Sequence, residues 1–136
     1  MTAIYLDVGR VLRLHELVIR QSGGSIAVLQ PNLLDSAVAQ PSMRFSGEDL
    51  HPDIPSKAAA YLFHICMNHP FEDGNKRTAH VTAEVFLMMN GYALTGTVDE
   101  LEQFTVGVAA GTISKDEAIG FFRAHASPLE IDQASP

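Results

Sequence analysis

The segment from Ser56 to Met67 is apolar on nearly every side, and this constrains the fold more than any other stretch of the sequence. It is rich in residues that favour helices, and a helix without a polar face must be surrounded by other elements. The segment stops at His69 and Pro70, because a proline disfavours helical geometry in the residue before it. We therefore expect a central buried helix that begins near Pro55.

A second central helix is expected from Asn75 to Asn90, where apolar residues recur at helical spacing and Asn90-Gly91 forms a terminator. Only residues 4–6 and 92–94 look extended, and both stretches are too short to support a sheet. The pattern is that of an all-α fold of about six helices. The other helices are expected at residues 7–22, from Pro31 to near Pro41 with a loop over 41–53, and after two capping boxes, Asp99 with Glu102 and Ser114 with Glu117.

A chain of 136 residues that is 46% hydrophobic is sufficient for one domain with an ordinary core. We assign this domain to residues 1–126 and expect 127–136 to be a disordered tail. The single cysteine, Cys66, lies in an apolar run and fits a reducing compartment. The sequence has no leader-like start and no long apolar run, so we expect a cytoplasmic protein without a membrane partner.

The formal net charge of -7 repels polyanions on average, and the lysines and arginines are scattered. We therefore expect no nucleic-acid partner.

The pair Lys76-Arg77, beside Asn75, is the one place where the scattered positive charges cluster. It opens the second central helix, where unpaired backbone amides and the helix dipole favour an anion. Gly74 would let the backbone approach a phosphate, while the two cations suit phosphate oxygens.

Asp73 lies four residues after His69 and is placed to hold a divalent cation beside such phosphates, since Mg²⁺ is commonly bound by one or two carboxylates together with phosphate oxygens and water. His69 needs only to reach an incoming hydroxyl to act as a general base. A base, a metal ligand and a phosphate site are therefore predicted within residues 69–77.

The stretch His69-Pro70-Phe71-Glu72-Asp73-Gly74-Asn75-Lys76-Arg77 resembles the signature H-x-F-x-[DE]-G-N-[GK]-R of the Fic/Doc family. The likeness to its death-on-curing (Doc) branch covers roughly residues 4–125 and implies a single-domain, Fic-type helical bundle whose active-site loop joins two central helices. Further stretches that resemble this branch are Leu14-His15-Glu16, Gly23-Gly24, Leu33-Leu34-Asp35-Ser36-Ala37, Lys57-Ala58-Ala59, Asn90-Gly91-Tyr92 and Val106-Gly107-Val108-Ala109-Ala110-Gly111.

The resemblance also implies an activity. Members transfer part of a nucleoside triphosphate such as ATP to a protein hydroxyl with Mg²⁺, and the Doc branch phosphorylates elongation factor Tu, arrests translation and is restrained by a small antitoxin. AMP-transferring members have glycine where this chain has Lys76, so phosphoryl transfer is favoured over AMP transfer, with a catalytically weak binding module as the non-enzymatic alternative. The implied roles are general base for His69, Mg²⁺ ligand for Asp73, phosphate binding for Gly74, Asn75, Lys76 and Arg77, and anchoring of the loop for Phe71.

Taken singly, these residues would be ordinary turn and helix-end residues, but their combination favours a functional site.

The other histidines are interpreted structurally. His64 is expected in the core, His80 in a helix-surface pair with Glu84, and His15 in a surface pair or local hydrogen bond, since Ile19 stands where a zinc site would need a second histidine. The loop that carries His51 is the region that the resemblance implies would line up the target.

Overall fold

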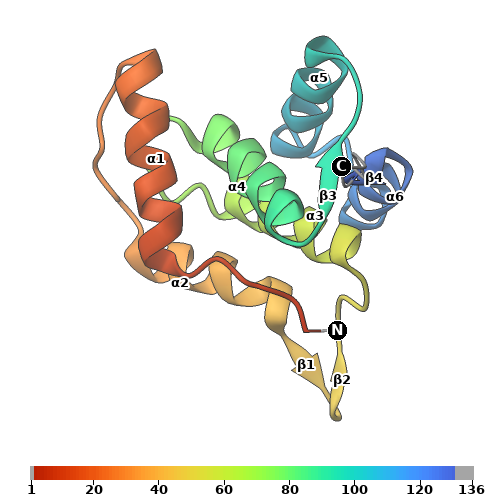
Figure 1. Cartoon of the computed structure of the whole chain (residues 1–136). Helices are drawn as coiled ribbons and strands as arrows, with labels where there is room; N and C mark the ends of the chain where they lie inside the picture. The colour runs from red at the N-terminus through yellow and green to blue at the C-terminus, as the bar shows by residue number, and fades with distance from the viewer. Residues whose placement is uncertain (1, 131–136) are drawn as a thin grey trace, which may run out of the picture.

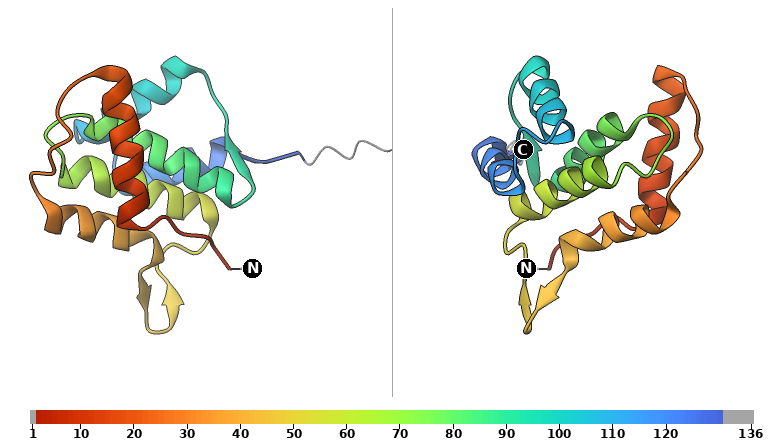
Figure 2. Two further views of the ribbon diagram at one scale, coloured as in Figure 1. Left: turned by 60° about the vertical axis from the view of Figure 1, so that its left-hand side comes forward. Right: turned by 180° about the vertical axis from the view of Figure 1, so that it is seen from behind.

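Helices α3 (Ile54–Asn68) and α4 (Asn75–Met89) pack side by side in the middle of the computed structural model, which describes residues 2–130 (Figure 1). Helices α1 (Val8–Ser22) and α2 (Pro31–Ala39) lie on one side of this pair. Helices α5 (Val98–Ala109) and α6 (Lys115–His125) lie on the other side (Figure 2). The expected all-α fold with its motif between two central helices is confirmed.

Helix α3 is central because it is buried on most of its surface. Its alanines at 58–60 are fully buried and allow neighbouring helices to approach closely, while Tyr61 and Phe86 of α4 lie with their ring centroids 5.0 Å apart. The Tyr61 hydroxyl donates to the carbonyl of Leu6 at 3.0 Å and accepts from its amide at 2.9 Å. The stretch at 4–6 is therefore held by side chains and is not a strand.

One of the two expected capping boxes lies elsewhere. Ser114 and Glu117 form the expected box at α6, but α5 begins two residues early, with Thr97 as N-cap and Glu100 completing the box. Threonine and aspartate both have a glutamate three residues on, so the sequence permitted either start. The earlier start leaves Asp99 in the first helical turn, where the helix dipole favours a negative charge.

The segment expected to be a loop over 41–53 contains regular structure. A 3-10 turn (Gln40–Ser42) is followed by a hairpin of β1 (Arg44–Phe45) and β2 (Glu48–Asp49). Both residues between the strands have positive φ, 52° at Ser46 and 80° at Gly47, which is the pattern of a tight hairpin turn. The hairpin lies at the start of α3, at the other end of this helix from His69, so it does not border the motif loop.

The disordered tail was expected to begin at residue 127, but the first residues of this segment are ordered. Strand β4 (Ala126–Pro128) pairs antiparallel with β3 (Tyr92–Leu94), and the amide of Leu129 donates to the carbonyl of Gly91 at 2.8 Å. These ladder hydrogen bonds order the first residues of the segment, and residues 131–136 lie outside the described part of the chain. Within residues 2–130, no helix has both the length and the apolar character that crossing a membrane requires.

Two histidines have buried ring nitrogens, His51 in the loop before α3 and His64 within α3. His51 is 2% exposed, and neither of its ring nitrogens has a hydrogen-bond partner among the described residues; the same holds for Nε2 of His64. Burial, and to a lesser extent the charge of Lys115, lowers the pKa of each imidazole to about 4. His64 is only half-buried as a residue, and its Nε2 lacks the partner that a satisfied core histidine would have among residues 2–130.

This pair predicts a pH-dependent stability. Both side chains bind protons near pH 6.5 in the unfolded chain but only near pH 4 in the folded chain, so the unfolded state gains protons first as the pH falls. We expect the free energy of unfolding to change little above pH 7 and to fall by up to about 5 kcal/mol between pH 6.5 and 4, the sum for the two imidazoles. Urea denaturation at pH 7, 6 and 5 measures this, and equal midpoints would contradict it.

Candidate active site

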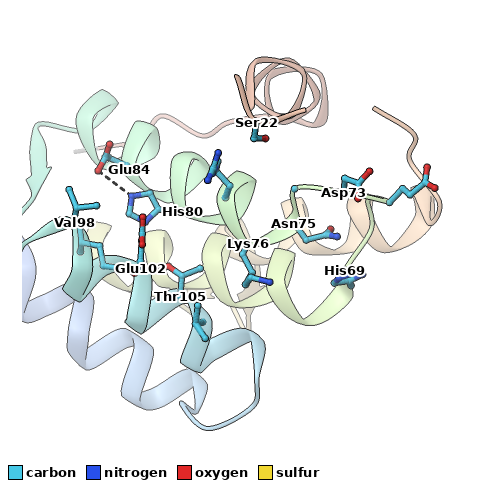
Figure 3. A pocket seen from close by; sticks show the side chains of 15 residues that line it. Ser22, His69, Asp73, Asn75, Lys76, His80, Glu84, Val98, Glu102 and Thr105 are labelled. Carbon is cyan, nitrogen blue, oxygen red and sulfur yellow. Dashed lines mark hydrogen bonds and ion pairs between the residues drawn. The ribbon is translucent and has the colours of Figure 1, made fainter. Parts of the chain in front are cut away.

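The motif loop, residues 69–74, joins α3 to α4. Its first residue has a left-handed backbone conformation. His69 ends α3 in the left-handed conformation (φ 46°, ψ 56°), and its amide donates to the carbonyl of Ile65 at 3.1 Å. This conformation costs a residue with a side chain roughly 1 to 2 kcal/mol, and Pro70 prevents the helix from continuing. The exposed His69 side chain lines a cavity (Figure 3).

The start of α4 has the features of an anion site. The amide of Thr78 is the first to bond within the helix, to the carbonyl of Gly74 at 2.9 Å, so the amides before it have no intrahelical partner. Lys76 and Arg77 are exposed and line the same cavity, and neither takes part in an ion pair with any residue between 2 and 130. Their charges remain available to a ligand.

Gly74 is explained by packing. Its φ of 78° is in the left-handed region, and a Cβ at this position would lie 3.0 Å from Cδ1 of Ile19 and 3.4 Å from Cγ1 of Val18. Both of these residues belong to α1. The packing against α1 is therefore sufficient to require glycine here, and the expected approach of Gly74 to a phosphate stays a prediction.

Asn75 holds the loop in shape. Its side chain is 5% exposed, its Oδ1 accepts from the amide of Phe71 at 2.9 Å, and its Nδ2 donates to the carbonyl of Phe71 at 2.8 Å. Phe71 itself is fully buried, as the sequence predicted. The structure gives the Asn75 side chain a structural task, because both ends of its amide already bond backbone, while phosphate binding by Asn75 stays a prediction.

Asp73 is fixed by two contacts from α1 and the segment that follows it. Its Oδ2 accepts from the amide of Ser25 at 2.7 Å, and its backbone carbonyl accepts from Nε2 of His15 at 2.8 Å. No residue within the described range donates a hydrogen bond to Oδ1. One carboxylate oxygen is therefore occupied, and the other is left for a ligand.

Residues 25–30 run antiparallel along the motif loop. Val28 and Phe71 form a β-bridge, and the amide of Glu72 donates to the carbonyl of Ala27 at 3.0 Å. The amides of Leu29 and Gln30 both donate to the carbonyl of Pro70, at 2.9 and 3.0 Å. This segment, and not the hairpin before α3, is the extended element that borders the motif.

The cavity has a volume of about 790 Å³ and two chemically different ends (Figure 3). His69, Asp73 and Lys76 lie at one end, with the start of α4. At the other end, His80 lies 3.6 Å from Glu84, the predicted helix-surface pair, next to residues of α5. The α5 residues that line this end are Val98, Leu101, Glu102, Thr105 and Val106.

Comparison with known proteins shows the family of this chain. Residues 5–87 match the model of the Fic/DOC family. This chain belongs to the Fic/Doc family. It is 44% identical over 77 residues to a protein named toxin Doc from Mycolicibacterium smegmatis, a match that spans 57% of this chain and 59% of that protein. It is 33% identical over 104 residues to the protein kinase doc of Escherichia phage P1, a match that spans 76% of this chain and 81% of that protein.

Two carboxylates of the motif loop, Glu72 and Asp73, line the cavity, and the Asp73 side chain is fixed by the Ser25 amide. Between residues 2 and 130, no group of three or more His, Cys, Asp or Glu side chains is arranged to hold a cation. The free Oδ1 of Asp73 beside two unpaired cationic side chains fits a Mg²⁺ ion that arrives with a phosphate-bearing ligand, since Mg²⁺ then keeps phosphate and water ligands. It does not fit a resident metal bound by protein alone.

His15 is the contact residue that sequence reasoning missed. It was expected in a surface pair or local hydrogen bond, yet it is 1% exposed and bonds Asp73, 58 residues away. The signal was present, because Val11, His15 and Val18 fall on one face of a helix and both valines are buried.

Proposed function

We propose that this chain is a Doc-like toxin that transfers a phosphoryl group from a nucleoside triphosphate, ATP in the first instance, to a serine or threonine hydroxyl of a protein. Elongation factor Tu is the first target to test, with inhibition of translation as the consequence. The observation that carries the proposal is the common cavity of His69, Asp73 and the cationic start of α4. The names of the two relatives, a toxin and a protein kinase, support it.

The proposed reaction assigns one task to each group. His69 accepts the proton of the target hydroxyl as its oxygen bonds to the γ-phosphorus, and the bond from that phosphorus to the bridging oxygen breaks, releasing nucleoside diphosphate. Lys76, Arg77 and the unpaired amides of α4 stabilise the charge on the phosphate oxygens. Asp73 would hold Mg²⁺, which when bound neutralises phosphate charge.

Transfer of AMP by the same site is the second candidate, and Lys76 separates the two. A lysine side chain at the start of α4 fills space that glycine would leave to the phosphates, so it supports the orientation that presents the γ-phosphate to His69. We expect Lys76→Gly to lower phosphoryl transfer at least tenfold and to produce AMP-modified target. Mass spectrometry of the target measures both products, and unchanged phosphoryl transfer would remove Lys76 from this role.

The experiment that tests the function is the intact mass of elongation factor Tu, and of total soluble protein, after incubation with this chain, Mg²⁺ and ATP. A gain of one phosphoryl group supports the proposal, and a gain of one AMP supports the second candidate. No gain on any protein would contradict the enzymatic proposal and favour a catalytically weak module that binds an antitoxin or another peptide.

A small antitoxin partner is part of the proposal. One relative carries the name toxin, and the cavity is open to a segment of another protein. The sequence contains no inhibitory [ST]-x-x-x-[ED]-[GN] helix of its own, so restraint would have to come from a separate chain.

A further inference from the structure

His15 contacts the motif loop through two different parts of its ring. The face stacks on Phe71, with centroids 3.7 Å apart and an interplanar angle of 8°, while Nε2 lies 2.8 Å from the carbonyl oxygen of Asp73. Since a carbonyl oxygen only accepts, Nε2 carries the proton in this contact. Phenylalanine could supply the face and glutamine the donor, but neither supplies both.

The bond to Asp73 fixes a peptide plane. In a trans peptide the C=O of Asp73 and the N–H of Gly74 point in opposite directions, so drawing the carbonyl toward His15 directs the amide away from it. Gly74 lines the cavity and His15 does not. The same contact therefore determines the direction of a donor at the start of α4.

His15 also helps to fix the Asp73 carboxylate, through the Asp73 backbone. Its Oδ2 is held by the Ser25 amide at 2.7 Å, and its backbone by His15, so the side chain is fixed at both ends. Gly24 leaves room for this carboxylate, because a Cβ at position 24 would lie 3.0 Å from both Cβ and Oδ2 of Asp73.

We propose that His15 is a positioning residue, which orients the Asp73 carboxylate for Mg²⁺ and the Gly74 amide for phosphate through a single hydrogen bond. This inference rests on the roles proposed above for the site. It assigns to a buried residue of α1 an effect on nucleotide and metal binding that stacking on Phe71 alone would not produce.

The test separates the hydrogen bond that His15 donates to Asp73 from its stacking on Phe71. His15→Phe keeps an aromatic ring against Phe71 and removes the donor, while His15→Gln keeps an amide donor and removes the ring. His125→Phe is the matched control, since His125 stacks on Phe121 at 3.9 Å and its Nδ1 lies 2.9 Å from the Phe121 carbonyl oxygen, in α6 and outside the cavity.

Two measurements are made on the full chain: titration with a non-hydrolysable ATP analogue with and without Mg²⁺, and the ¹H–¹⁵N spectrum of the Gly74 amide. For His15→Phe we expect a half-saturating Mg²⁺ concentration raised about tenfold, as for other residues that hold a metal ligand in place, and a shifted Gly74 amide signal. His15→Gln should recover part of both effects, and His125→Phe should show neither.

Wild-type Mg²⁺ dependence and an unchanged Gly74 amide in His15→Phe would overturn the proposal, as would loss of binding that only follows a fall in melting temperature. The Gly74 spectrum of the unliganded chain decides for or against His15 even if the wild-type chain binds no nucleotide. In that case the proposed function fails separately, and the two failures remain distinguishable.

Discussion

Replacement of His69 by asparagine is expected to lower the rate of transfer to the target protein by about 10² to 10⁴-fold, the usual contribution of a general base. The side chain is exposed in the cavity beside Asp73 and Lys76, and its removal breaks no hydrogen bond of the fold. We therefore expect nucleotide affinity to be retained, so that kcat falls and KM for ATP changes little.

Asparagine is the sharper choice because His69 has a left-handed backbone. Asparagine tolerates this conformation better than alanine, so His69→Asn should unfold at or near the wild-type temperature, whereas His69→Ala should lose about 1 kcal/mol. Single-turnover rates and thermal unfolding of both variants measure this. His125→Ala, in α6, is the control for loss of a histidine away from the cavity. Transfer by His69→Asn at the wild-type rate would exclude His69 as the base.

The boundaries of the central helices were predictable because strong local signals mark them. Pro70 ends α3, and an asparagine followed by glycine ends α4 at Met89. The start of α5 was not predictable to the residue, because two overlapping capping boxes are equally good as local patterns. Which box forms is decided by how the helix then packs, and a local pattern does not contain this information.

The residues of the candidate site were predictable from the sequence, but the separate role of each residue was not. The motif brought His69, Asp73 and Lys76 to one cavity, as expected. The sequence could not show that Asn75 turns inward, since an asparagine at a helix start is equally suited to a ligand and to a backbone group. Nor could it show which segment lies against the loop, because residues 25–30 reach it only through tertiary packing.

Replacement of Asn75 by alanine is expected to reduce both stability and activity. It leaves the buried amide and carbonyl of Phe71 without partners, and each lost partner costs roughly 1 to 3 kcal/mol. We expect the free energy of unfolding to fall by about 2 to 6 kcal/mol, and transfer per folded molecule to fall at least about 10²-fold, because the loop then no longer fixes His69 and Asp73. Urea denaturation and single-turnover rates measure the two effects.

Asn90→Ala is the matched control for Asn75. The Asn90 side chain makes the same pair of bonds to the backbone of Ile4, with Oδ1 accepting at 2.8 Å and Nδ2 donating at 2.9 Å, far from the motif loop. It should lower stability without lowering transfer per folded molecule. If Asn75→Ala instead lowered nucleotide affinity with unchanged stability, its side chain would bind phosphate after all. Equal behaviour of the two variants would mean that the loop does not depend on Asn75 for its shape.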